Sequence, residues 1–161
     1  LHPPLLDEAG LNSAIRWFVE GFAKRSGIEV NLQIFDPSRR FEDSVELVLF
    51  RALQESLTNV HRHSGATQAD VCLALSGNRL ALTVKDNGRG MPATVVRDLK
   101  EDGTAGGVGL AGMMERIREI GGRLEIKSGS QGTEVVARVP VRQQKNAPSD
   151  TFSSEAQQVR G

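Results

Sequence analysis

Residues 80–90 read Leu-Ala-Leu-Thr-Val-Lys-Asp-Asn-Gly-Arg-Gly, and this stretch decides how the rest of the chain is interpreted. Up to Asp86 the residues alternate in the manner of a half-buried strand. Because successive strand side chains point to opposite faces, Asp86 shares a face with Leu80, Leu82 and Val84. A carboxylate in an apolar row is costly to bury without a partner. Because glycines follow Asp86, this stretch predicts a pocket floor that hydrogen-bonds a polar group on a flat, mostly apolar ligand.

The same residues allow a simpler interpretation, because Asn-Gly after a strand is the strongest short signal for a hairpin turn. A hairpin needs a second alternating run directly after the turn. The chain instead continues with residues 89–93, Arg-Gly-Met-Pro-Ala, which place a proline where a strand would have to pair. We therefore favour a binding site over a turn at this position.

The length and composition of the chain indicate a single domain. The 20 basic and 20 acidic side chains give no net charge, and no basic stripe argues for nucleic acid or an anionic membrane surface. The single cysteine, Cys72, cannot form an internal disulfide, which fits a cytoplasmic setting. No apolar run approaches a membrane span and no signal peptide pattern opens the chain, so we expect no membrane contact by this domain.

Periodicity divides the chain into three parts. Residues 1–11 are broken by prolines and predict a lead-in, which we interpret as the end of a linker from a missing dimerisation helix region. Residues 12–141 contain the periodic segments and predict the folded domain. Residues 142–161 are polar and without periodicity, which predicts a disordered tail.

Within the domain, the apolar spacing predicts alternating helices and strands. The expected order is helix 12–26, strand 28–35, helix 42–63, strands 69–75 and 79–86, helix 110–120, and strands 123–128 and 133–139. Residues 87–107 predict a mobile loop with one helical turn around 95–99. This order predicts an α/β two-layer sandwich, with a mixed, mostly antiparallel sheet and helices on one face.

Glu55 and Asn59 lie four residues apart in the predicted helix 42–63 and therefore share a face. The side-chain carbonyl of Asn59 suits a hard cation such as Mg²⁺, and the carboxylate of Glu55 suits a water or a proton. Taken alone, the pair is better explained as a solvated helix face on which Arg51 pairs with Glu55.

Two weaker patterns lie nearer the C-terminus. Gly107 and Gly109 precede the predicted helix 110–120, where free backbone N–H groups and the helix dipole favour an anion such as a triphosphate. A flexible loop before a helix explains them as well, and the absence of a Gly-x-x-x-x-Gly-Lys-Ser/Thr run excludes a P-loop. Thr133 begins strand 133–139 on its inward face, which an ordinary β-branched strand residue also satisfies.

Four segments in this order resemble the sequence boxes of the GHKL ATPases, the superfamily of gyrase, Hsp90, histidine kinases and MutL. Residues 54–63 (Gln-Glu-Ser-Leu-Thr-Asn-Val-His-Arg-His) resemble the N box, and residues 86–91 (Asp-Asn-Gly-Arg-Gly-Met) resemble the G1 box. Residues 107–113 (Gly-Val-Gly-Leu-Ala-Gly-Met) resemble the G2 box, and residues 132–133 (Gly-Thr) resemble the closing pair of the last hairpin. The resemblance covers roughly residues 1–140 and implies a Bergerat-type, histidine-kinase-like ATPase fold.

Within that superfamily the chain is most similar to the NarL/DegS/DesK-type sensor histidine kinases. Residues 1–7 (Leu-His-Pro-Pro-Leu-Leu-Asp) resemble the segment that links their dimerisation helices to the ATPase domain. Residues 112–117 resemble their Gly-Met-Arg-Glu-Arg helix, with Met114 where arginine is usual. No histidine here is followed by an acidic residue, as the phospho-acceptor of this subfamily is, so the resemblance implies an acceptor outside this chain.

The resemblance implies Mg-ATP as the ligand and gives roles to matching positions. Asp86 would accept a hydrogen bond from the adenine amino group, with Thr133 supporting it through water. Asn59 would ligate Mg²⁺, Arg62 would approach phosphate, and Glu55 is the candidate catalytic residue. The other positions expected at the nucleotide are His63, Gly88, Gly90, Met91, Gly107, Gly109 and Leu110.

The function implied is donation of the γ-phosphoryl group of ATP to a histidine on a dimerisation domain of the same protein, after which a response regulator takes it. Such a domain works in the cytoplasm, including as the cytoplasmic part of a membrane-bound sensor. One alternative is a serine kinase of the anti-sigma-factor type, which residues 1–7 argue against. The other is a non-catalytic docking domain that binds no nucleotide, which the intact Asp86 and Asn59 argue against.

Overall fold

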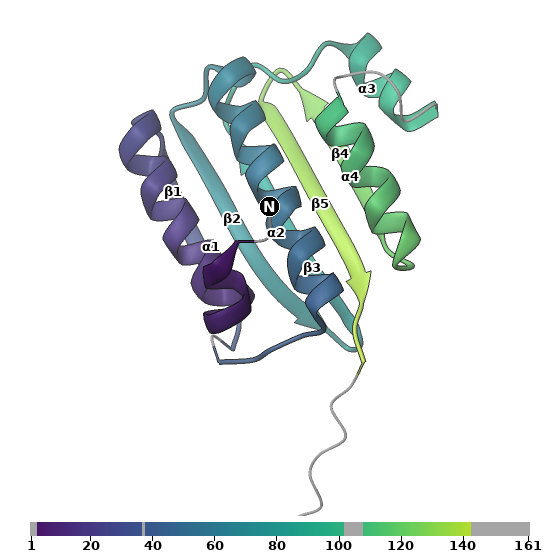
Figure 1. Cartoon of the computed structure of the whole chain (residues 1–161). Coiled ribbons are helices and arrows are strands. Elements are labelled where there is room, and N and C mark those ends of the chain that lie inside the picture. Colours follow the sequence, from purple (N-terminus) through teal and green to yellow (C-terminus); the bar gives the residue numbers. More distant parts are fainter. Residues whose placement is uncertain (1–2, 37, 102–107, 143–161) are drawn as a thin grey trace, which may run out of the picture.

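The computed structural model describes residues 3–36, 38–101 and 108–142. Its elements are α1 (Pro4–Ser26), β1 (Glu29–Ile34), α2 (Asp43–Asn59), the short π-helix η1 (Val60–Ser64), β2 (Gln68–Ser76), β3 (Arg79–Asp86), α3 (Ala93–Glu101), α4 (Val108–Glu119), β4 (Arg123–Gly129) and β5 (Gly132–Pro140). The strands form one sheet in the order β1-β2-β3-β5-β4 (Figure 1).

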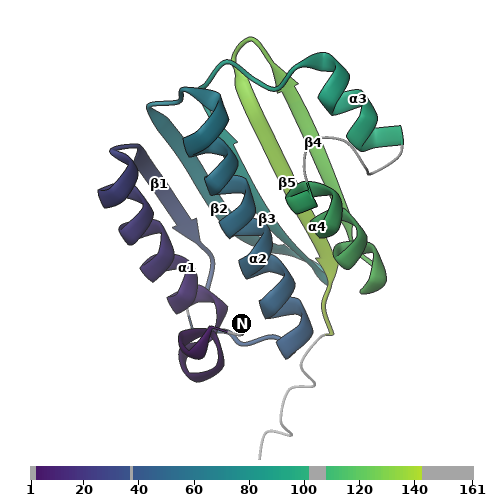
Figure 2. The same ribbon diagram turned by 45° about the horizontal axis from the view of Figure 1, so that its top comes forward.

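The sheet carries its long helices on one face. Strand β1 pairs with β2 in parallel, and the pairs β2–β3, β3–β5 and β5–β4 are antiparallel. Helices α1, α2 and α4 lie side by side across one face, while α3 lies near one end of β4 (Figure 2). The predicted two-layer sandwich with a mostly antiparallel sheet is therefore confirmed.

The core lies between this helical layer and the sheet. Leu49, Leu53 and Leu57 of α2 are completely buried at helical spacing. They face the inward row of β3, in which Leu80 and Leu82 alternate with more exposed neighbours. Burying a leucine side chain contributes roughly 1.5–3 kcal/mol to stability relative to leaving it exposed. The same alternation brings the last residue of the row, Asp86, to the helical side of the sheet.

The first residues do not form the proline-broken lead-in that the sequence predicts. Helix α1 already begins at Pro4, because proline is tolerated in the first helical turn, where its missing N–H would have no partner. The break falls instead at Gly10, whose φ of 86° and ψ of 177° interrupt the helix. Leu6, before the break, is 2% exposed and belongs to the core. The prediction therefore misses the helical segment before Gly10, whereas the segment after the break begins close to the predicted residue 12.

Two other elements differ from expectation. The end of the long helix widens into η1, so the predicted helix 42–63 is α-helical only over Asp43–Asn59. The predicted single turn around residues 95–99 is the longer helix α3, which starts after Pro92. The remainder of the predicted mobile loop (residues 102–107) and nearly all of the predicted tail (residues 143–161) lie outside the described residues. None of the helices described is both long and apolar enough to cross a membrane.

Candidate functional site

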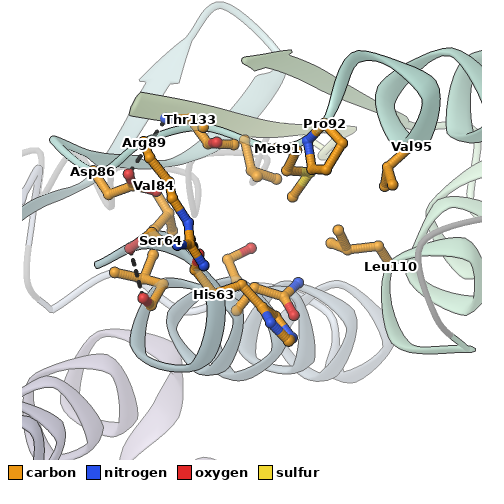
Figure 3. Close-up of a pocket in the computed structure, with 15 residues that line it drawn as sticks. His63, Ser64, Val84, Asp86, Arg89, Met91, Pro92, Val95, Leu110 and Thr133 are labelled. Carbon is orange, nitrogen blue, oxygen red and sulfur yellow. Dashed lines mark hydrogen bonds between the residues drawn. The ribbon is translucent and has the colours of Figure 1, made fainter. Parts of the chain in front are cut away.

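A cavity of about 600 Å³ opens where the end of α2, η1, the end of β3, the start of β5 and the start of α4 meet (Figure 3). Most of its wall is apolar and comes from these elements, from α3 and from the segment between β3 and α3. The apolar side chains are Val60, Val84, Met91, Pro92, Val95, Leu110 and Val135. A cavity of this size with few polar groups suits a small, largely flat organic ligand that a small number of hydrogen bonds orients.

Asp86 is the carboxylate of this cavity and is 5% exposed. Its Oδ1 accepts hydrogen bonds from the backbone N–H groups of Gly88 at 2.8 Å and Thr133 at 3.4 Å. The second oxygen, Oδ2, accepts no hydrogen bond from the described residues. The burial of Asp86 is therefore compensated on one oxygen only, and the other is left for a donor on a ligand.

Thr133 lies beside Asp86 and joins a short chain of hydrogen bonds. Its Oγ1 is 2.8 Å from Oγ of Ser128. The Oγ of Ser128 also accepts a hydrogen bond from the backbone N–H of Met91 at 2.6 Å. Ser128 faces Thr133 across the hairpin of β4 and β5. These hydrogen bonds tie the segment after β3 to strands β4 and β5. Ser128 was not predicted, and the register of this hairpin is the signal that could have found it.

The glycines that follow β3 are required by the protein's own backbone. A Cβ on Gly88 would overlap the carbonyl oxygen of Ser64, and a Cβ on Gly90 would overlap that of Gly129. Gly90 also has a φ of 80°, which side-chain-bearing residues rarely adopt. Gly90 lines the cavity, whereas Gly88 is not among the lining residues and donates its N–H to Asp86.

The helical wall carries Asn59 and His63, one turn apart, and both line the cavity. Met91, Leu110 and Thr133 also line the cavity. The structure therefore brings together seven of the twelve predicted positions. They are Asn59, His63, Asp86, Gly90, Met91, Leu110 and Thr133.

The other predicted residues lie elsewhere. Arg62 is exposed and does not line the cavity. The carboxylate of Glu55 packs so closely against Gly109, in the first turn of α4, that a Cβ on Gly109 would overlap it. Neither residue lines the cavity. Gly107 lies outside the described residues.

The predicted set missed several wall residues. Ser56, Ser64 and Arg89 line the cavity, together with most of the apolar wall. No sequence signal marks an apolar wall residue, because its spacing is that of any core residue. Arg89 stands inside the predicted G1 segment, and only its contact with η1 reveals its direction.

The metal-binding potential of this region rests on an amide. The described residues include no cluster of three or more His, Cys, Asp or Glu side chains that could hold a metal ion. Asn59 offers one oxygen to the cavity, which fits Mg²⁺ if phosphate and water supply the other ligands.

The family model of the histidine kinase-, DNA gyrase B-, and HSP90-like ATPases matches residues 44–143. The chain belongs to this family. The matched span includes every residue of the cavity wall described above. The predicted GHKL resemblance is therefore confirmed.

Relatives within this ATPase family are sensor histidine kinases. The chain is 35% identical over 143 residues to the sensor histidine kinase NarS of Mycobacterium tuberculosis, covering 88% of this chain and 32% of that protein. It is 31% identical over 137 residues to the signal transduction histidine-protein kinase/phosphatase DegS of Brevibacillus brevis, covering 84% of this chain and 34% of that protein. The chain thus spans about a third of these relatives, and the predicted similarity to NarL/DegS-type kinases is confirmed.

A solved structure supports the fold. The histidine kinase domain from the blue-light activated histidine kinase EL346 of Erythrobacter litoralis superposes with a TM-score of 0.71 at 21% identity. The match covers 84% of this chain and 68% of that one. The sandwich described above is therefore the fold of a histidine kinase ATPase domain.

Proposed function

We propose that this domain binds Mg-ATP in the cavity at Asp86 and donates its γ-phosphoryl group to a histidine on a dimerisation domain that this chain does not contain. The observation that carries the proposal is the buried carboxylate of Asp86, with Oδ1 bound internally and Oδ2 left to the cavity. A purine amino group is a donor on the edge of a flat, weakly polar ring, which matches that oxygen and the apolar wall.

The chain's own residues would position the nucleotide. Asp86 orients the base, and the hydroxyl of Thr133, already bonded to Ser128, supports it through water. Asn59 would hold Mg²⁺ on the helical wall, with phosphate oxygens and water completing its ligands. Bound Mg²⁺ supplies charge neutralisation on the phosphates. Catalysis would rest on positioning and charge stabilisation rather than on covalent chemistry by the protein.

Glu55 has a more limited place in this proposal. Its carboxylate packs against Gly109 at the start of α4, away from the cavity wall. It would act on a terminal phosphate only if it turned from that position. In a histidine kinase the accepting imidazole is itself the nucleophile, so no residue is needed to activate a water.

The partners and the location follow from the relatives. A dimerisation domain with the acceptor histidine and a response regulator are the expected protein partners, because the relatives are named as sensor histidine kinases and signal transduction kinases. We place the domain in the cytoplasm, where ATP and response regulators are found.

Nucleotide binding is tested by urea denaturation with and without ATP in the presence of Mg²⁺. A ligand that binds only the folded state at 100 to 1,000 times its Kd raises the free energy of unfolding by about 3–4 kcal/mol. We expect a shift of this size with ATP and ADP. No shift at millimolar nucleotide would contradict the proposal.

Phosphotransfer is tested by adding a dimerisation domain from a relative together with labelled ATP. The proposal predicts label on that domain in an acid-labile form, as expected for phosphohistidine. Acid-stable label on a serine would instead indicate the anti-sigma-factor type of kinase.

A further inference from the structure

Helix α1 is interrupted at a single residue, Gly10. The φ of 86° and ψ of 177° at Gly10 turn the backbone N–H of Leu11 away from the helical direction. In an unbroken helix that N–H would donate to the carbonyl oxygen of Asp7, four residues earlier. The part of α1 before the break, residues 4–9, is dark purple at the lower end of α1 in Figure 2, and we call it the strap.

One ion pair takes the place of that helical hydrogen bond. The N–H of Leu11 donates to Oε2 of Glu46 at 3.2 Å, and Nη2 of Arg40 donates to the carbonyl oxygen of Asp7 at 3.4 Å. The same nitrogen of Arg40 lies 3.1 Å from Oε1 of Glu46. The pair of Arg40 and Glu46, which we call the latch, thus spans the break from donor to acceptor. It also fixes the break to α2, on which Glu46 lies.

The strap is attached by few buried contacts. Leu6 is the one buried residue of the strap, and 43% of the side chain of Arg40 in the latch is exposed. The part of α1 after the break is anchored much more firmly, by buried Leu11, Ala14, Ile15, Val19 and Phe22. Segments with few buried contacts open at a lower free-energy cost than the whole domain. The strap is therefore the part of α1 that can separate from the core most easily.

We propose that the strap leaves and rejoins the sandwich as a unit, with Gly10 as the joint and the latch as the contact that closes it. The rest of the domain stays folded throughout. A change of backbone angles at one residue is enough, and glycine adopts both positive and negative φ readily. The docked form requires glycine, because a Cβ on Gly10 would lie 2.6 Å from Cδ and Nε of Arg40.

The use of this joint rests on the proposed function. A domain that donates a phosphoryl group to a histidine of another domain has to approach that domain and withdraw from it. Residues 1–7 resemble the segment that joins the dimerisation helices to the ATPase domain, so this movement would enter through the strap. A joint at Gly10 lets the sandwich turn on the strap while α2, which carries Asn59, keeps its packing.

Native-state hydrogen exchange, measured by NMR at increasing urea, tests the proposal. No nucleotide is used, so failure of this proposal is distinct from failure of the proposed function. The probes are the amides of Ala9 and Leu11, on either side of Gly10, and of Leu53, which is completely buried in α2. We expect Ala9 and Leu11 to exchange through one opening that depends little on urea, whereas Leu53 exchanges through global unfolding.

Gly10→Ala and Gly27→Ala form a matched pair of variants. Both glycines have a positive φ, 86° and 72°, but a Cβ would meet Arg40 at Gly10 and nothing within 4 Å at Gly27. We expect Gly10→Ala to speed exchange at Leu11 about 10-fold, because the strain acts against the docked strap. Gly27→Ala strains the docked and released forms equally, so it should speed exchange at Leu53 and leave Leu11 unchanged.

Three results contradict the proposal. One is exchange at Leu11 with the urea dependence of Leu53, which would show that the strap and the sandwich unfold together. Another is an equal effect of Gly10→Ala and Gly27→Ala on exchange at Leu11. The third is a Gly10→Ala chain that does not fold, because a strap that can be released limits the cost of the substitution to the cost of release.

Discussion

At the scale of single residues, Asp86 divides its two oxygens between the fold and the cavity. Oδ1 accepts hydrogen bonds from the backbone N–H groups of Gly88 and Thr133, which orient the carboxylate without any ligand. Oδ2 remains for a ligand. Such an arrangement would be pre-organised for the proposed ligand, because backbone N–H groups already orient the carboxylate.

Ser128→Ala tests the hydrogen-bond chain beside this carboxylate. The substitution leaves the backbone N–H of Met91 and the hydroxyl of Thr133 without their shared partner. We expect a loss of about 1 kcal/mol in the free energy of unfolding, and faster amide exchange at Met91. Ser76→Ala, at an exposed serine of β2, is the control and should change stability by less than about 0.5 kcal/mol. Equal stability of the two variants would show that the hydrogen bonds of Ser128 contribute nothing to the free energy of unfolding.

Gly132→Ala tests the close approach of the hairpin to the end of β3. Gly132 has a φ of 126°, and a Cβ there would overlap the carbonyl oxygen of Asp86. Gly77 also has a positive φ, 59°, but its Cβ would meet open space. Gly132→Ala should therefore cost at least about 2 kcal/mol more than Gly77→Ala in urea denaturation, because backbone must move. Similar costs for both variants would contradict the overlap.

The residues of the site differ in how far the sequence could predict them. Asp86 and Thr133 follow from the period of two in strands, which fixes the face of every side chain. Arg62 and His63 follow the point at which the helix becomes a π-helix, at Val60, and no local sequence signal announces that change. The direction of Arg89 depends on a contact with residues far away in the sequence.

At the scale of elements, the break in α1 is held by a buried glutamate. The carboxylate of Glu46 accepts from the backbone N–H of Leu11 at 3.2 Å, which the break at Gly10 leaves without a helical partner. It also pairs with Nη2 of Arg40 at 3.1 Å and accepts from the N–H of Phe41. One side chain thus joins the start of α2 to α1 and to the connection after β1.

Glu46→Ala should destabilise the domain by about 2–4 kcal/mol, because it leaves buried donors without an acceptor. The partly exposed Arg40 can be hydrated again, which keeps the loss below that of a fully buried pair. Glu42→Ala is the matched control, since the side chains of Glu42 and its partner Arg142 are 55% and 89% exposed. It should cost less than about 1 kcal/mol. Equal urea midpoints for the two variants would show that Glu46 does not stabilise the break in α1.

Element boundaries were predicted less well than element types. Every predicted helix and strand exists, because each has a clear period of its own. The start of α1 was misjudged because Pro3 and Pro4 were interpreted as breakers, although proline suits the first turn. Helix α3 was underestimated because its apolar stripe is only two turns long.

At the scale of the whole molecule, the sheet order creates the site. The order β1-β2-β3-β5-β4 places the end of β3 beside the start of β5, and η1 and the start of α4 line the cavity with them. The fold class was predictable from the order of elements, and four motifs in the family's order gave the family. The cavity wall was not predictable, because it depends on packing between elements separated by up to eighty residues or so along the chain.

The central claim is that Asp86 binds the base of a nucleotide in this cavity, and calorimetric titration of ATP with Mg²⁺ into Asp86→Asn tests it most directly. Asn keeps an oxygen for the internal N–H groups but presents a donor where the ligand's donor must bind. Asp70→Asn, at an exposed aspartate of β2, is the control. We predict unchanged melting of both variants, unchanged affinity for Asp70→Asn, and affinity lowered on the order of 100-fold for Asp86→Asn. A folded Asp86→Asn that binds ATP as tightly as the unaltered chain would contradict the account.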